Sequence, residues 1–269
     1  MIDAISREKT MGEKLTTFET GNDAKVEIVP LLKGDTDYPK RITITVTTAA
    51  IKNATTVAVS FSCATAGQSI KIPAGTCLPF TDPLTGNVVS ATVITAVNIA
   101  LTTGTGPYTA TGSISLDANH LAIPINSTSS NFILLGARST ATGTVTLADE
   151  QLRTFDSPLF DQGQIVGASG EFSCDGAFSA IDAGLTTVAN LTIGASTHNG
   201  SSVISTPGNY MWVVITTPPP AAGYSSGVVR RAICYCTDQT IDVQAGAISK
   251  QSLPFKANGS VFTDPAIVT

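Results

Sequence analysis

The sequence predicts an all-β protein built from β-sandwich or barrel domains. The chain contains 39 threonines and 24 serines among its 269 residues, and they alternate with valine, isoleucine and alanine. Alternation with a period of two places polar and apolar side chains on opposite faces of a strand, and β-branched side chains suit a pleated sheet. Candidate strands recur about every ten residues with turn residues between them, which is typical of a sandwich or a small barrel.

The first strand is expected at residues 24–30, after a charged and extended N-terminal arm. From residue 41 the alternation becomes dense, and the runs 42–46 and 56–63 predict a β-hairpin around a short connection. Two short strands follow within 69–80 around a Pro-Ala-Gly turn, in which proline presets φ and glycine accepts a positive φ. Further strands are expected at 88–100, 108–116, 121–125, 132–135 and 142–147.

The second half contains the clearest hairpin of the chain. Residues 210–216 and 227–236 are both rich in apolar residues, and the Pro- and Gly-rich linker 217–226 between them predicts an exposed loop. Before this hairpin, residues 158–179 are expected to be extended, whereas residues 181–193 fit either a short helix or a strand. Strands at 240–244 and 252–257 complete the prediction.

A polar break at residues 149–156 and the change of character at residue 41 delimit one candidate domain. Residues 41–148 are rich in threonine and alanine and carry regularly spaced strands. We therefore predict that residues 41–148 form a β-sandwich of their own.

The chain is acidic and poor in charge. It has 15 basic and 20 acidic residues, and charged residues make up only 13% of it. Such a chain lacks the basic surface that binds nucleic-acid phosphates, and its charged fraction is well below that of a typical cytosolic enzyme. The N-terminal residues do not have the pattern of a signal peptide, and no run of about 18 apolar residues occurs. We expect a protein that is made in a cytoplasm, does not span a membrane and becomes part of an assembly such as a virion.

The cysteines and histidines do not predict a catalytic or metal site. The five cysteines are scattered and odd in number, which fits reduced core thiols better than a disulfide framework. His120 and His198 both lie beside asparagine in polar segments, where a surface position is expected. A zinc site needs roughly three or four Cys and His ligands with local pairing, and Cys234-x-Cys236 alone is a weak candidate. The five cysteines are Cys63, Cys77, Cys174, Cys234 and Cys236.

No other motif in the sequence predicts catalysis. The sequence lacks the nucleophile elbow, the P-loop and the dinucleotide-binding glycine motif. With 6% aromatic residues and a single tryptophan, Trp212, a sugar cleft lined by aromatic platforms is hard to build. We therefore expect that the protein is not an enzyme and uses no cofactor and no metal.

Acidic residues are concentrated in the middle of the chain. Between Ile72 and Val229 there are nine acidic and two basic residues. In an assembly, this part could face DNA that has to slide without sticking, although solubility is a simpler explanation. The candidate lumen or assembly residues are Asp156, Asp161, Glu171, Asp175 and Asp182.

Several segments of the second half resemble the major tail tube protein of tailed bacteriophages. In that family a late hairpin carries an apolar-aromatic strand and its return strand, and the last strand ends near a glycine. The resemblance covers residues 1–40 and 149–269, and it implies that these form one tail-tube-like domain into which residues 41–148 are inserted. The segments that carry it are 164–178, 182–185, 211–215, 231–236 and 253–259.

What the resemblance implies is a structural role in a virion that is assembled in the host cytoplasm. Subunits of this family form hexameric rings that stack into a hollow tube, and the tube conducts DNA. The implied partners are further copies of the chain, the terminator, tape measure and baseplate proteins of the tail, and DNA in transient passage, with no membrane. Closure of a sheet across subunits would also remove exposed strand edges. Two alternatives stay open: a capsid decoration protein, and a carbohydrate-binding β-sandwich module.

Overall fold

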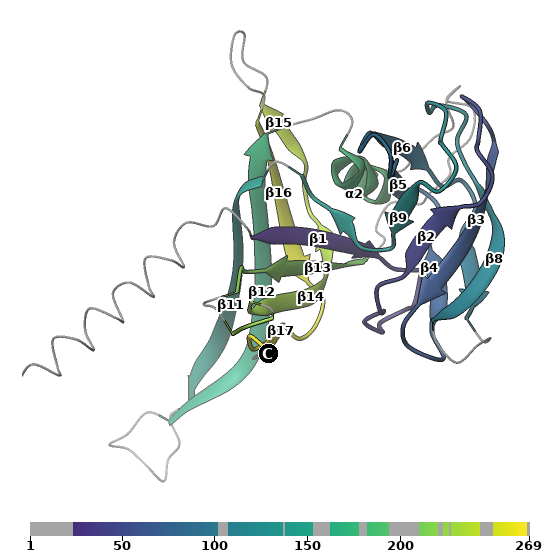
Figure 1. Ribbon diagram of the computed structural model, residues 1–269. Coiled ribbons are helices and arrows are strands. Elements are labelled where there is room, and N and C mark those ends of the chain that lie inside the picture. Colours follow the sequence, from purple (N-terminus) through teal and green to yellow (C-terminus); the bar gives the residue numbers. More distant parts are fainter. Residues whose placement is uncertain are drawn as a thin grey trace, which may run out of the picture.

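The computed structural model describes residues 24–101, 107–136, 138–152, 162–177, 182–193, 210–219, 223–225, 227–242 and 250–267. The predicted N-terminal arm before residue 24 lies outside these residues. Within them the chain forms antiparallel β-sheets and one helix (Figure 1). The all-β prediction is therefore confirmed.

The larger sheet has nine strands. Its main path is β10-β1-β13-β14-β16-β12-β11, while β15 pairs with β16 and β17 pairs with β14. The predicted hairpin of 210–216 with 227–236 is confirmed as β13 and β14, which pair from Met211 opposite Cys234 to Thr216 opposite Val229. The strand bounds are β1 Lys25–Pro30, β10 Ile133–Leu134, β11 Arg138–Leu152, β12 Gln162–Ala177, β13 Met211–Thr216, β14 Val229–Cys236, β15 Thr240–Asp242, β16 Lys250–Ala257 and β17 Phe262–Asp264.

The chain connectivity requires this sheet to curl toward a barrel. β10 and β11 stand at opposite ends of the strand order, yet Leu134 ends one and Arg138 begins the other. Four Cα steps reach at most about 15 Å. In a flat sheet, seven strands would hold their edges about 29 Å apart. The sheet therefore bends around its core, which Phe172, Phe255 and Met211 help to fill.

A second sheet of six strands has the order β6-β5-β9-β2-β3-β8, and the pair β4-β7 shares its core. We call residues 43–130, which contain these strands, the module. The predicted hairpin of 42–46 with 56–63 is confirmed as β2 and β3, because Thr43 pairs with Ser62 and Val46 with Val59. The strand bounds are β2 Thr43–Val46, β3 Thr56–Cys63, β4 Ser69–Ile72, β5 Cys77–Thr81, β6 Val88–Thr92, β7 Val97–Ala100, β8 Tyr108–Ser115 and β9 Thr128–Ser130.

Residues 181–193, which fitted both a helix and a strand, form the helix α2 at Ala183–Ile193. Asp182 caps its first turn, because the Asp182 Oδ1 accepts a hydrogen bond from the Leu185 N–H at 3.1 Å. Gly184 is required by the close approach of the helix to β10, since a Cβ there would lie 2.6 Å from the Leu134 carbonyl oxygen. Threonine and valine inside the helix explain why its sequence also fitted a strand.

Three details of the strand prediction were wrong. Residues 121–125 form no strand and contribute only an isolated bridge between Ile123 and Ala50, because Pro124 has no N–H to donate to a ladder. Residues 88–100 form two strands, β6 and β7, which belong to different sheets. The three-residue strands β9 and β17 were missed, because such short elements show no periodicity.

The place where the chain leaves the module and enters the larger sheet also differs from the domain boundary that the sequence predicted at residue 148. β10 and β11 both belong to the larger sheet, so the module ends near residue 130. Alternation in β11 resembles alternation in the module, and it does not reveal which sheet a strand will join.

Candidate assembly surfaces

The β11–β12 hairpin projects beyond the rest of the larger sheet. β12 pairs with β16 only over residues 171–177, whereas its pairing with β11 continues as far as Leu152 opposite Gln162. Residues 146–152 and 162–169, which we call the ribbon, therefore have no other strand partner within the described part of the chain (Figure 1). A lone two-stranded ribbon is marginally stable in water. The ribbon is a candidate surface for another protein chain.

β11 is also the longest edge strand of the larger sheet. Of its 15 residues, 14 pair with β12 on one side, and no described strand pairs with the other side. Register shifts interrupt the pairing between Arg138 and Thr140 and between Ala148 and Asp149. An open edge offers N–H and carbonyl groups to a strand of a second chain, and bulges limit where such a strand can pair.

Three of the five acidic candidate residues lie within the described part of the chain, namely Glu171, Asp175 and Asp182. Asp156 and Asp161 lie outside the described residues. Glu171 and Asp175 share the face of β12 that points away from the core, since the alternate residues Phe172 and Cys174 are buried in it.

Asp182 has a different position. It lies at the start of α2, where its carboxylate and carbonyl oxygens accept hydrogen bonds from the first turn. Helix capping is a sufficient explanation for this residue.

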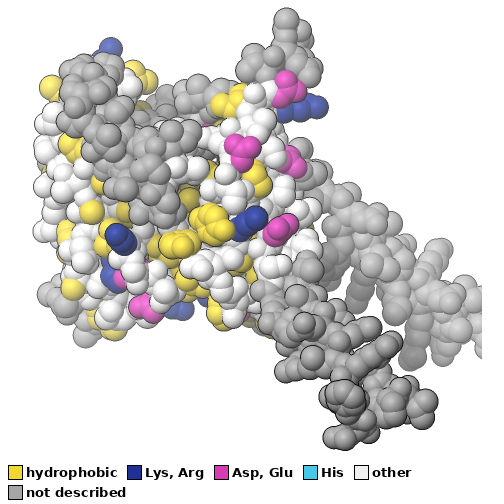
Figure 2. Space-filling view, turned by 180° about the vertical axis from the view of Figure 1, so that it is seen from behind, with side chains coloured by type: hydrophobic (Ala, Val, Ile, Leu, Met, Phe, Trp, Pro, Cys, Tyr) yellow, Lys and Arg dark blue, Asp and Glu magenta, His cyan; other side chains and the backbone are white. Residues whose placement is uncertain are grey.

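Charged side chains are sparse on the surface. In the face that Figure 2 shows, the acidic and basic side chains are scattered among larger white areas and small groups of hydrophobic side chains. This appearance follows from the charged fraction of 13%. Contacts with a partner would therefore rely mainly on backbone, hydroxyl and apolar groups.

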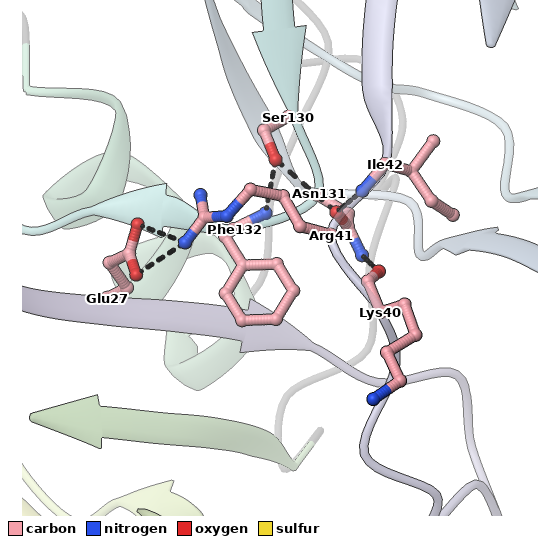
Figure 3. Close-up of polar contacts among 7 residues, drawn as sticks. All are labelled: Glu27, Lys40, Arg41, Ile42, Ser130, Asn131 and Phe132. Atoms are coloured by element: carbon pink, nitrogen blue, oxygen red, sulfur yellow. Dashed lines mark hydrogen bonds and ion pairs between the residues drawn. The ribbon is translucent and has the colours of Figure 1, made fainter. Parts of the chain in front are cut away.

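Asn131 holds together the two segments that connect the module with the larger sheet. Its Nδ2 donates a hydrogen bond to the Lys40 carbonyl oxygen at 3.0 Å, and its Oδ1 accepts one from the Ile42 N–H at 2.8 Å (Figure 3). Asn131 is 6% exposed. The segments that lead into and out of the module are thus hydrogen-bonded to each other through the buried side-chain amide of Asn131.

Arg41 extends this junction to β1. It donates hydrogen bonds to both carboxylate oxygens of Glu27, at 2.9 and 2.7 Å, and its guanidinium carbon lies 4.4 Å from the centre of the Phe132 ring (Figure 3). The Arg41 side chain is 52% exposed, so the ion pair contributes modestly. The contact of one guanidinium nitrogen, Nη2, with both oxygens of Glu27 and the contact with the ring orient the connection.

Helix α2 forms a second attachment between the two sheets. The Thr187 Oγ1 accepts a hydrogen bond from the Cys77 N–H of β5 at 2.9 Å, and the Asn190 Nδ2 donates one to the Gly75 carbonyl oxygen at 2.8 Å. On its other side, Leu185 and Val188 are buried in the core of the larger sheet. The module is therefore fixed to the larger sheet at two places.

An aromatic cluster covers the opposite face of the larger sheet. The Trp212 Nε1 donates a hydrogen bond to the Asp37 carbonyl oxygen at 3.1 Å. The Tyr38 ring packs edge-on against the Trp212 ring, with 5.1 Å between the ring centres. Arg231 lies 4.1 Å from the centre of the Tyr38 ring and forms an ion pair with Asp264 of β17 at 3.1 Å. Burial raises the pKa of Tyr38, although the Arg231 charge opposes this shift.

All five cysteines are buried, which confirms their predicted place in the core. Burial raises the pKa of Cys77 to about 11 and that of Cys234 to about 12. Both groups are therefore neutral thiols at neutral pH and poor nucleophiles.

The surface position expected for His120 was wrong. The residue is 6% exposed, and its ring nitrogens lie 2.7 Å from the Leu121 carbonyl oxygen and 2.8 Å from that of Ala54. It ties two loops of the module together, which the polar sequence context does not reveal. His198 lies outside the described residues.

The described residues contain neither a metal-binding cluster nor a membrane-spanning helix. No group of three or more His, Cys, Asp or Glu side chains there is arranged to hold a metal ion. No helix among them has the length and hydropathy needed to cross a membrane.

Solved structures that are similar to this chain include two from gene transfer agent particles. No protein-family model and no curated protein matches the chain. A chain from the tail of an empty gene transfer agent particle with C6 symmetry has a TM-score of 0.33 at 10% identity, over 50% of this chain and 87% of that one. A chain from the virion of a native gene transfer agent particle has a TM-score of 0.32 at 10% identity, over 49% of this chain and 88% of that one.

Proposed function

We propose that the chain is a structural subunit of a phage-like virion, and that it assembles as hexameric rings that stack into a hollow tail tube. The observation that carries the proposal is the ribbon, a projecting hairpin without a strand partner in the described part of the same chain. The sequence resemblance to tail tube proteins supplies the type of assembly.

The open edge of β11 supports the same proposal. A curled sheet that is open on one side can be completed by a neighbouring copy, and ring closure leaves no free edge to cause uncontrolled association. The low surface charge fits extensive burial between subunits. Catalysis has no part in this function.

The proposed partners are other copies of the chain, the terminator, tape measure and baseplate proteins, and DNA that passes through the lumen. Glu171 and Asp175 are acidic residues on the face of β12 that points away from the core, where Lys256 of β16 lies opposite Glu171. Acidic groups along a lumen would repel the phosphates of DNA and prevent the DNA from binding to the wall of the tube. In this proposal, these two residues face the lumen.

Electron microscopy of the purified full chain, together with its mass by light scattering, tests the proposal. Hollow tubes or six-membered rings are the expected result. Discrete trimers would favour a capsid decoration protein, and a monomer that binds glycans would favour a carbohydrate-binding module.

A shortened ribbon tests the observation itself. Replacement of residues 147–168 by an Asn-Gly turn joins Thr146 to its pairing partner Ser169 and leaves the pairing of β12 with β16 in place, because that pairing begins at Glu171. We expect the variant to fold but to lose ring and tube formation. The fluorescence of Trp212, the only tryptophan, reports folding because this residue is 4% exposed and lies outside the ribbon. Tubes of normal length from the folded variant would contradict the role of the ribbon.

A further inference from the structure

The turn between β16 and β17 contains an asparagine that is followed by a glycine. Asn258 and Gly259 come directly after the last residue of β16, and β17 begins at Phe262. The sequence has one other pair of this kind, Asn199-Gly200, which lies outside the described residues. Glycine has no Cβ, so the backbone nitrogen of Gly259 has an unobstructed path to the Asn258 side chain.

Both groups that could react within this turn are free. Asn258 is exposed, and no described residue forms a hydrogen bond or an ion pair with its carboxamide. The Gly259 N–H has no hydrogen-bond partner within the described part of the chain. Gly259 is also exposed and has a φ of 112°. No hydrogen bond therefore has to break before the backbone nitrogen meets the side-chain carbonyl carbon.

The backbone on both sides of this pair is held in place. The Asn258 N–H donates a hydrogen bond to the Ile233 carbonyl oxygen of β14 at 2.7 Å. After the turn, β17 pairs with the same strand, with Phe262 opposite Arg231. Between these points, Val261 packs against the core of the larger sheet. The exposed part of the turn is thus short and is tethered at both of its ends.

We propose that Asn258 is a site of spontaneous modification, and that the product releases β17 from β14. The Gly259 nitrogen attacks the side-chain carbonyl carbon of Asn258 and forms a C–N bond. The N–H proton passes to the leaving NH₂ group, which departs as ammonia, and a five-membered succinimide ring remains. Water then adds to one of the two carbonyl carbons of the ring and opens it, which gives aspartate or isoaspartate at position 258.

This reaction is independent of the proposed tube. Both reacting groups belong to one chain, and water is the only other reactant. No oxidant, reductant or second copy of the chain takes part. The reaction therefore adds a modification site to the protein, whatever assembly the protein forms.

Isoaspartate changes the length of the backbone in the turn. In this product the main chain runs through the former side chain, so it contains one additional CH₂ group. Because the turn is tethered at both ends, the strands beside it have to take up the added length, and β17 has only three residues. Its displacement separates the Phe262 ring from the Trp212 ring, whose centres lie 6.0 Å apart, and Asp264 from Arg231.

Ageing of the purified full chain at mildly alkaline pH tests the reaction. We expect mass spectrometry of peptides to show loss of the Asn258 carboxamide before any change at Asn87. Asn87 is the internal control, because it is exposed but is followed by Val88, whose branched side chain obstructs the attack. An isoaspartate-specific methyltransferase should label the peptide that contains residue 258. Intact Asn258 after Asn87 has begun to change would overturn the proposal.

Hydrogen exchange tests the effect of the modification on β17. In the aged protein we expect faster exchange at the paired amides of 229–231 and 262–264 and a red shift of Trp212 fluorescence, while β2 and β3 keep their exchange rates. Asn258→Gln is the matched control, because its longer side chain would have to close a larger ring, and the aged variant should exchange as the fresh protein does. Fresh Asn258→Asp protein, which gains the charge without the longer backbone, should also keep β17 paired. Isoaspartate at position 258 with unchanged exchange in β17 would overturn the release.

Discussion

Individual buried polar side chains fix the connection between the two sheets. Asn131 satisfies one N–H and one carbonyl group of the incoming chain with a single amide. Buried groups of this kind are costly to leave without a partner. The junction therefore depends on the identity of a residue that the sequence does not single out.

Asn131→Ala is expected to lower the free energy of unfolding by about 2–3 kcal/mol, since two backbone groups near a buried position lose their partner. Urea unfolding, followed by Trp212 fluorescence, measures the change. Asn119→Ala is the matched control, because Asn119 is exposed, and its effect should stay within about 0.5 kcal/mol. Equal effects of the two substitutions would contradict a special role for Asn131.

The buried thiols predict a loss of stability at alkaline pH. In the unfolded chain Cys234 titrates near its ordinary value of 9.0, whereas in the folded chain its pKa is about 12. The folded state therefore holds a proton that the unfolded state has lost, and the free energy of unfolding falls as pH rises from about 9 to about 12. Below pH 9 the thiol contributes no pH dependence.

Urea midpoints at several pH values between 8 and 11 test this effect. The Cys234→Ala variant separates this thiol from tyrosines and lysines, which also titrate at high pH. Its midpoint should fall less steeply with pH than that of the unaltered protein. Parallel curves for the two proteins would refute the contribution of Cys234.

At the scale of elements, helix α2 connects two cores. Its apolar face fills the core of the larger sheet, and Thr187 and Asn190 reach the module from its other side. Its 11 residues would be marginally helical in isolation. Packing on both sides therefore supplies most of its stability.

Thr187→Val tests the attachment of helix α2 to the module. The substitution keeps the side-chain shape but removes the hydroxyl that accepts a hydrogen bond from the Cys77 N–H. We expect a loss of about 1–3 kcal/mol in the free energy of unfolding and faster hydrogen exchange at the Cys77 amide. Thr186→Val is the control, because the Thr186 hydroxyl donates only within the first turn, to the Asp182 carbonyl oxygen. Exchange at Cys77 that is equally slow in both variants would contradict the docking role.

At the scale of the whole molecule, the larger sheet and the module have different places in the proposed assembly. In the proposed tube, the ribbon and the edge of β11 offer backbone pairing to neighbouring copies, while Asn131 and helix α2 attach the module to the larger sheet. The two attachments hold the module and the larger sheet in one fixed relation.

The sequence by itself determined the all-β class, the two confirmed hairpins and the burial of the cysteines, because these follow from alternation and composition along a short stretch of chain. Only the tertiary structure decided the remaining features. Whether residues 183–193 became a helix depended on the capping by Asp182 and on two cores that meet there. That β11 joined the larger sheet, and that β6 and β7 went to different sheets, both depend on pairings between residues distant in the chain. A local pattern fixes which face of a strand is apolar, but it contains no information about which distant strand will cover that face.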